Sequence, residues 1–377
     1  MLELGGVGPV PFCGMYFADL GADVIRIERP LGDDALSQSR QKLNLTSRGK
    51  RTIAMDFRGD EGKAVALDLI ARSDVVMEGF RPGVLERLGL GPDDCLKLNP
   101  GIVYGRMTGW GTGGPSSDVA AHDINYLGMS GLLDAIGTSD QPIPPLNIVG
   151  DFGGALYLVT GLLAALINAR VTGKGQVVEA SILGGTLALM AQLFTIKDHG
   201  DWVMQRQSNW TDGGAPFYRT YRTRDGYFMA VGAIEPQFYR ALVDMLGLDE
   251  VVELALQMDR STWLQTGRAF ADAFAARTRA EWAELAATVD ACCTPVLDLD
   301  EARSHPSALA AGMFVTVGDK VEPAPQPVFS LTPPGVPQPC GLLGGAAESV
   351  LREIGRDKAA IEALYENGTV SRPIAAA

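Results

Sequence analysis

MLELGGVGPVPFCGMYFADLGADVIRIERP, residues 1–30, decides the fold class. It opens with a short apolar segment, continues through a Gly/Pro turn and a helical pattern, and ends in a strand at 23–27. A strand, a helix and a second strand in this order form a βαβ unit. We therefore expect an α/β protein that begins with two parallel strands.

The same alternation continues along the chain. Apolar strand patterns occur at 51–55, 75–80, 102–107 and 177–182. Helical patterns occur at 62–72 and 151–170, and a second long helix follows the last of these strands and ends at about residue 195. Strands that alternate with helices indicate a Rossmann-like parallel sheet that is mostly buried. A helix is also expected at 348–366.

The chain is long enough for more than one domain. We predict a large α/β domain at 1–197, a polar linker at 198–216 and a smaller α+β domain at 217–310. The smaller domain begins with FYRTYRTRDGYFMAVGA (217–233), which has a hairpin pattern with Asp225-Gly226 at its turn. Residues 311–340 read as a proline-rich linker. Residues 341–377 are expected to return to the large domain.

The composition excludes several classes of protein. The chain of 377 residues carries a net charge of −13, which argues against a general nucleic-acid binder. Its five cysteines show no metal-ligand spacing, so we expect free thiols and no metal site. No signal-peptide pattern is visible, which favours the cytoplasm. The apolar run 155–169 is shorter than the roughly 20 residues of a membrane span, so we expect a buried helix and no membrane partner.

Two segments suggest phosphate binding. Gly6-x-Gly8 imitates a dinucleotide fingerprint, but Pro11 stands where the third glycine belongs, so a tight turn is the better interpretation. The second is a basic segment, and on an acidic protein it is as consistent with a polyphosphate site as with a solvated face. It comprises Arg40, Lys42, Arg48, Lys50, Arg51 and Arg58, with Arg29 close by.

Three residues are candidates for acid–base chemistry. His122 lies between a glycine-rich stretch and an apolar helix, where it serves either as a backbone-bonding residue or as a general base. Asp151 precedes a long helix, so it is either a helix cap or a carboxylate beside a positive helix end. Glu235 precedes Pro236 at a strand edge, and its default interpretation is a surface residue.

Seven strings occur in register along nearly the whole chain, and together they resemble the α-methylacyl-CoA racemase family of the class III CoA-transferase fold group. They are GADVIRIERP (21–30), AHDINY (121–126), PPLNIVGDFGG (144–154), TGKGQVVEA (172–180), DGGAPFY (212–218), VGAIEPQFY (231–239) and DACCTPVL (290–297). The departures include Ala121 for a usual glycine, Phe57-Arg58 for a usual Leu-Lys, and Cys293 for a usual valine. None of them removes a catalytic residue.

The resemblance implies a role for each candidate. His122 and Asp151 match the two catalytic bases, and Glu235 matches a carboxylate that orients the histidine. The resemblance also implies an interlocked homodimer, in which Glu235 reaches the site of the other chain. Coenzyme A is part of the substrate, and no separate cofactor is implied. The positions that match its binding residues are Arg29, Met55, Asp56, Phe57, Arg58, Arg87, Ala121, Asp123, Ile124, Asn125 and Tyr126.

The implied reaction interconverts (R)- and (S)-2-methylacyl-CoA through an enolate. Neutral His122 removes a proton while protonated Asp151 donates one, and the reverse direction exchanges these roles. We expect the N–H groups at the helix start after Asp151 to stabilise the enolate oxygen. The main alternative is a class III CoA transferase, in which Asp151 accepts the acyl group. A third possibility is a catalytically silent CoA-binding protein. The acyl chain is not identified.

Overall fold

The computed structural model describes residues 1–30 and 44–373, so Arg40 and Lys42 of the basic segment lie outside the described residues. The chain divides into two compact units. Unit 1 comprises Met1–Ser130, Leu146–Leu189 and Leu309–Ala377, and unit 2 comprises Gly131–Pro145 and Met190–Ala308.

Unit 1 is built on a six-stranded parallel sheet with the strand order β3-β2-β1-β4-β5-β6. The expected α/β class and parallel sheet are confirmed. The strands are β1 (Leu2–Leu4), β2 (Ile25–Glu28), β3 (Arg51–Ala54), β4 (Val75–Glu78), β5 (Val103–Thr108) and β6 (Gln176–Ser181).

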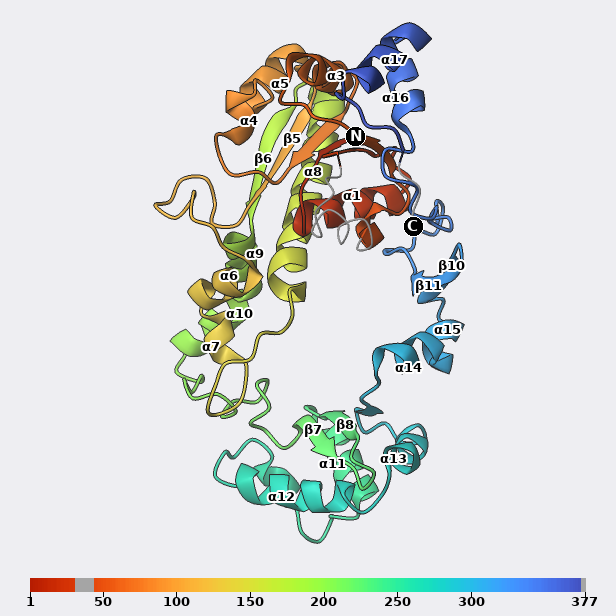
Figure 1. Cartoon of the computed structure of the whole chain (residues 1–377). Coiled ribbons are helices and arrows are strands. Elements are labelled where there is room, and N and C mark those ends of the chain that lie inside the picture. Colours follow the sequence, from red (N-terminus) through yellow and green to blue (C-terminus); the bar gives the residue numbers. More distant parts are fainter. Residues whose placement is uncertain (31–43, 374–377) are drawn as a thin grey trace. The chain divides into compact units, whose positions relative to one another are not determined.

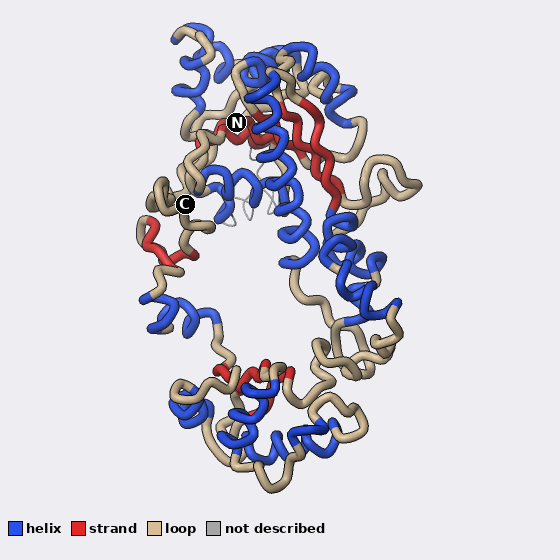
Figure 2. The backbone as a smooth tube through the Cα atoms, turned by 180° about the vertical axis from the view of Figure 1, so that it is seen from behind, coloured by secondary structure: helices blue, strands red, loops and turns tan. Residues whose placement is uncertain are grey.

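Alternate side chains of each strand point to opposite sides, so both faces of this sheet carry apolar residues. Helices cover both faces. In β4, Val75 and Met77 join one apolar cluster, whereas Val76 joins the other. Helices α1 (Pro9–Asp19) and α8 (Gly153–Thr172) pack on the first face. The opposite face is covered by α3 (Asp60–Ala71), α5 (Pro92–Leu98), α16 (Ala347–Glu353) and α17 (Lys358–Glu366). The strands therefore lie between two layers of helices (Figure 2).

Several helices differ from the sequence-based expectation. The helix expected at 348–366 is two helices, α16 and α17, because Gly355 between them has a positive φ of 89°. The long helix expected after β6 is likewise divided, into α9 (Ile182–Leu189) and α10 (Ala191–Asp198). Unit 1 also contains η1 (Asn44–Ser47), α4 (Val84–Arg87), α6 (Asp123–Ser130) and the hairpin β10 (Phe314–Val317)–β11 (Lys320–Pro323).

Helix α8 lies along β5 and β6 (Figure 1). Together with the π-helical turn η2 (Ile148–Phe152) it forms one helix of 25 residues, in which an 18-residue stretch has a mean hydropathy of 1.7. This helix is longer than the apolar run indicated, and it is only partly buried. Leu158 and Leu162 pack on the sheet, whereas Ile167 and Val171 are 68% and 81% exposed. The outer side of α8 is therefore an apolar surface of the single chain.

Unit 2 contains a three-stranded antiparallel sheet in the order β7-β8-β9. The predicted hairpin is β7 (Tyr218–Arg222) and β8 (Phe228–Gly232), and β9 (Cys293–Pro295) joins it. Helices α11 (Pro236–Leu246), α12 (Trp263–Phe274) and α13 (Arg279–Ala286) contribute aromatic residues to one core with these strands. The remaining short helices are α7 (Leu132–Ala135), η3 (Leu254–Leu256) and α14 (Leu299–Ser304), and α15 (Pro306–Ala310) lies at the boundary of the units.

Candidate active site

The candidate site of unit 1 lies where the strand order reverses. β1 pairs with β2 on one side and with β4 on the other, so the loops after β1 and β4 diverge. Parallel sheets bind ligands at such switch points, beside the carboxyl ends of the strands. The loop after β1 contains three glycines with positive φ, namely Gly5, Gly6 and Gly8. A Cβ atom on Gly8 would lie 3.4 Å from Asp151 Oδ2, which places the Asp151 carboxylate at this switch point.

Asp151 does not cap a helix, contrary to the prediction. It lies in the first turn, within η2, and Asn147 occupies the N-cap position. The Asn147 side-chain amide donates a hydrogen bond to Asp151 Oδ2 at 3.2 Å. The main-chain N–H of Asp151 donates to Asp123 Oδ1 at 2.8 Å. The carboxylate is therefore fixed both through its own oxygen and through its backbone.

The predicted oxyanion donors after Asp151 are wrong for this conformation, because their N–H groups are already bonded. The Phe152 N–H donates to the Asn147 carbonyl at 3.4 Å, and the Gly153 N–H donates to carbonyls of the same π turn. The helical turn begins at Ile148, so the amides of Phe152 and Gly153 lie beyond the start of the helix, whose first amides alone are left free. The sequence carries no pattern that distinguishes these two arrangements.

His122 precedes helix α6 in the same unit and is exposed. Its main-chain N–H donates to Asn125 Oδ1 at 3.0 Å, and its carbonyl accepts from the Asn125 N–H at 2.9 Å. This local turn orients the residue without using its imidazole. The imidazole is close enough to Asp151 to affect the titration of that carboxyl group.

The electrostatic environment of Asp151 raises the pKa of its carboxyl group above the ordinary value. Burial raises the pKa of its carboxyl group, and the negative charge of Asp123 raises that pKa further. The hydrogen bond from Asn147 and the nearby His122 act in the opposite direction without reversing it. A carboxyl group with a raised pKa holds a proton more readily, as a general acid must.

Part of the expected CoA set lies together at the ends of β2 and β3. Arg29 and Arg58 are both exposed, and both influence the titration of Asp56. Asp56 forms an ion pair with Arg58 at 2.7 Å. In contrast, Met55 and Phe57 are buried in the core, so their side chains are not available to a ligand in the single chain. The third expected cation, Arg87, is exposed at the end of α4.

Most side chains of the segment 121–126 have internal partners. Tyr126 is 6% exposed, donates to the Ala121 carbonyl at 3.1 Å, and packs edge-on against Trp110. Asn125 bonds to the His122 backbone and Asp123 to that of Asp151, whereas the Ile124 side chain is 46% exposed. The contact of this segment with CoA stays a prediction.

The basic segment is not a continuous phosphate site within the described residues. Arg48 pairs with Asp19 and Glu322 at 2.6 and 3.0 Å, and Arg51 pairs with Asp23 and Glu353 at 2.5 and 2.6 Å. Lys50 is fully buried against Glu3 at 2.6 Å. These three cations stabilise the fold, because each is neutralised by the chain's own carboxylates.

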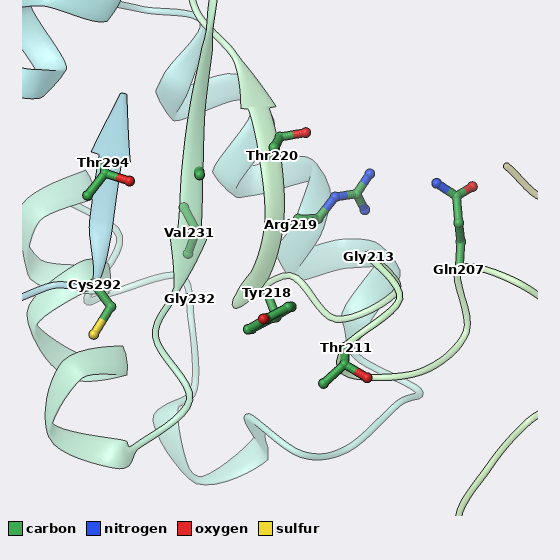
Figure 3. A pocket seen from close by; sticks show the side chains of 11 residues that line it. Gln207, Thr211, Gly213, Tyr218, Arg219, Thr220, Val231, Gly232, Cys292 and Thr294 are labelled. Carbon is green, nitrogen blue, oxygen red and sulfur yellow. The ribbon is translucent and has the colours of Figure 1, made fainter. Parts of the chain in front are cut away.

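Glu235 belongs to unit 2, where it is the exposed N-cap residue of α11. Burial raises the pKa of the Cys292 thiol, and the negative charges of Asp290 and Glu235 raise it further. Glu235 therefore lies near Cys292. Cys292 lines a cavity of about 650 Å³ over the open face of the β7-β8-β9 sheet. Figure 3 shows Cys292 on one side of this cavity and Arg219 and Gln207 on the other.

Two residues beside Asp151, Asn147 and Gly8, are not predicted from the sequence. Asn147 precedes Asp151 by four residues, a spacing that brings two helical side chains together and therefore signals the contact. Gly8 belongs to the same turn that imitates the dinucleotide fingerprint, and nothing in its local sequence indicates the distant aspartate. Among the described residues, no group of three His, Cys, Asp or Glu side chains is placed to hold a metal ion.

Residues 1–342 match CoA-transferase family III. The chain belongs to this family. The expected resemblance to α-methylacyl-CoA racemases is confirmed by two curated relatives. The mouse (Mus musculus) α-methylacyl-CoA racemase is 44% identical over 375 residues, which cover 98% of this chain and 96% of the relative. The human (Homo sapiens) racemase is 43% identical, with 94% and 92% covered.

The same family includes transferases. The succinyl-CoA:glutarate CoA-transferase of mouse is 29% identical, with 99% of this chain and 89% of the relative covered. A solved CAIB/BAIF family protein from Brucella suis superposes with a TM-score of 0.77 at 24% identity, covering 94% of this chain and 97% of its own. This superposition supports the fold.

Proposed function

We propose that this member of CoA-transferase family III is an α-methylacyl-CoA racemase, which interconverts (R)- and (S)-2-methylacyl-CoA. The observation that carries the proposal is the pairing, within unit 1, of an exposed histidine with a carboxyl group whose pKa is raised. A racemase needs one group that accepts a proton and one that donates a proton. His122 and Asp151 supply both, and the names of the mouse and human relatives agree with this assignment.

The two groups exchange roles with the direction of reaction. From one epimer, neutral His122 removes the α-proton while protonated Asp151 delivers a proton to the opposite face of the enolate. From the other epimer, the Asp151 carboxylate removes the proton and the His122 imidazolium delivers one. After each turnover the enzyme holds the same number of protons, but the proton has passed from one of the two side chains to the other. The next turnover in the same direction therefore requires proton exchange with solvent.

The CoA moiety is proposed to bind beside the ends of β2 and β3. Arg29 and Arg58 present exposed guanidinium groups there, which suits phosphate recognition. Arg87 is the candidate for a further contact. The thioester would then extend toward the switch point, where His122 and Asp151 lie.

We also propose a homodimer in which Glu235 of the partner subunit orients His122. The exposed apolar side of α8 supports an interface, because Leu163, Ile167 and Val171 are 40%, 68% and 81% exposed on the single chain. Large exposed apolar surfaces commonly mark contacts between proteins. We place this dimer in the cytoplasm.

Incubation of each 2-methylacyl-CoA epimer in deuterated water tests the activity. The wild-type enzyme is expected to give both epimers with deuterium at the α-carbon. His122→Ala and Asp151→Asn should each lose about 10²–10⁴-fold in rate, the usual contribution of general acid–base catalysis. Glu366→Gln, an exposed carboxylate at the end of α17, is the control and should leave the rate unchanged.

A CoA transferase would behave differently. It would transfer CoA to an acceptor acid through an acyl anhydride on Asp151, which hydroxylamine traps. Capture of this adduct without α-deuterium incorporation would replace the racemase assignment.

A further inference from the structure

Asp123 occupies an unusual position for an acid at the start of a helix. Such a residue normally accepts hydrogen bonds from the first amides of its own helix. In α6 the Asp123 side chain instead turns inward, and the residue is only 9% exposed. Its Oδ1 accepts the N–H of Asp151 at 2.8 Å, and the Gly150 amide also stabilises it. The carboxylate thus reaches across to the first turn of another helix.

The Asp123 carboxylate packs closely against Gly150, the residue before Asp151. A Cβ atom on Gly150 would lie only 2.1 Å from Asp123 Oδ1. A Cβ atom does not approach a non-bonded heavy atom so closely, so the Asp123 carboxylate fills the space over Gly150. The glycine therefore permits the close approach.

The contact joins the two proton-transfer residues. Asp123 is bonded covalently to His122, and its side chain holds the backbone of Asp151, although 28 residues separate Asp123 and Asp151 along the chain. A change in the position of α6 therefore moves both groups together. Acid–base residues on opposite faces of one carbon require this fixed separation, because a misplacement of about 1 Å can cost a hundredfold in rate.

We propose that Asp123 is a positioning residue that sets Asp151 relative to His122, rather than a ligand of CoA. This inference rests on the proposed racemase function. The hydrogen bond between the Asp123 side chain and the Asp151 backbone is the observation that carries it. In this proposal the Asp123 side chain acts through Asp151.

The Asp123 charge adds a second effect. Asp151 is faced by His122 and Asp123 from the α6 segment, by Asn147 from its own helix and by the Gly8 turn that begins α1. Tyr126 is also within electrostatic range. Of these groups, Asp123 is the one whose negative charge raises the Asp151 pKa. Replacement of Asp123 by asparagine would keep a side-chain oxygen that accepts the hydrogen bond and would remove this charge.

Two variants separate geometry from charge. Asp123→Ala removes the acceptor, so kcat for racemisation should fall about a hundredfold while KM for the acyl-CoA stays within about threefold. Asp123→Asn keeps the acceptor, so most of kcat should return. In the direction in which the Asp151 carboxylate removes the α-proton, the acidic limb of the kcat/KM profile should move to lower pH, because the Asp151 pKa falls. Asp60→Ala is the matched control, since Asp60 is an exposed acid that begins α3.

Hydrogen exchange followed by mass spectrometry tests the contact without the reaction. Peptides that cover 148–153 should exchange about tenfold faster in Asp123→Ala than in the wild type, and Asp123→Asn and Asp60→Ala should not differ from it. Equal exchange in all four proteins would overturn the proposal. A large rise in KM with unchanged kcat for Asp123→Ala would also overturn it, and would make Asp123 a CoA ligand.

The proposed function can fail separately. A wild-type protein that incorporates no α-deuterium, but whose variants show the expected exchange difference, would remove the racemase assignment and leave the positioning contact standing. If Asp123→Ala does not fold, Asp123→Asn still decides the charge effect. An unshifted acidic limb in that variant would contradict it.

Discussion

Arg106 is a buried cation that joins two neighbouring strands of the parallel sheet through an ion pair. It lies on β5 with its side chain 7% exposed, and its Nε is 2.6 Å from Glu78 Oε1 of β4. The Glu78 side chain is 2% exposed, and its other oxygen accepts the Phe80 N–H at 2.7 Å. Arg106 also binds Glu86 of α4 at 2.6 Å, but the Glu86 side chain is 41% exposed. A third and longer pair joins Arg106 to Glu179 at 3.7 Å, and the Glu179 side chain is 44% exposed. One buried and two exposed ion pairs thus share the same guanidinium group.

Replacement of Arg106 by methionine would leave the Glu78 charge buried without its cation. Breaking a buried ion pair in this way costs about 3–5 kcal/mol. The exposed pair with Glu86 contributes about 0–1 kcal/mol. Arg106→Met should therefore lower the free energy of unfolding by about 3–5 kcal/mol, and Glu86→Gln by less than about 1 kcal/mol. The double variant Glu78→Gln/Arg106→Met should recover much of the loss, because a neutral amide replaces the stranded charge.

Urea unfolding at one fixed protein concentration measures all four proteins. Concentration must be constant, because assembly of subunits would contribute to the apparent stability. The reasoning is refuted if Arg106→Met unfolds within about 1 kcal/mol of the wild type. It is equally refuted if Glu86→Gln is the more damaging change, or if the double variant is no more stable than Arg106→Met.

Three further outcomes are expected. Gly109→Ala should lower both kcat/KM and the melting temperature, because its Cβ would lie 2.0 Å from the Tyr126 hydroxyl; Gly113→Ala, which has open space, should lower neither. Asp151→Asn should stabilise the fold at pH 7, because burial raises the pKa of this carboxyl above its ordinary 3.8 and its charged form opposes folding. That advantage should disappear in thermal unfolding as the pH falls below 3.8, and a constant difference would contradict the assignment. Ile167→Asp should give folded monomers in analytical ultracentrifugation, whereas a dimer of unchanged affinity would exclude the outer side of α8 as the interface.

The sheet was predictable because each strand has a local signal. The apolar segments around Val75 and Val103 are bounded by turns, and burial on both faces requires continuous apolar character. The helix breaks at Met190 and Gly355 were missed. Apolar residues continue through the first break, and a single glycine is compatible with a helix at the second.

The roles of charged residues were less predictable than the strands. Arg48 and Arg51 belong to a basic segment, yet their partners Glu322 and Glu353 lie about 270 to 300 residues away along the chain. Ion pairs of this kind depend on the tertiary fold, and the composition of one segment contains no information about them. The surrounding motifs point to His122 and Asp151 as candidates, and their roles stay predictions, whereas only the structure reveals the hydrogen bond between Asp123 and the Asp151 backbone.

The incomplete dinucleotide fingerprint now has a physical explanation. In dinucleotide-binding folds, the amides at the start of the first helix hold a pyrophosphate. Here Pro9 and Pro11 remove two of these amides from the first turn of α1. The space over Gly8 is taken by the protein's own carboxylate, Asp151. A second anion at this turn would lie close to that carboxylate, so we expect the phosphates of CoA to bind elsewhere. The exposed Arg29 and Arg58 at the neighbouring strand ends stay the predicted contacts. The turn that resembles a phosphate site instead packs against Asp151, the carboxylate that we propose as an acid–base residue.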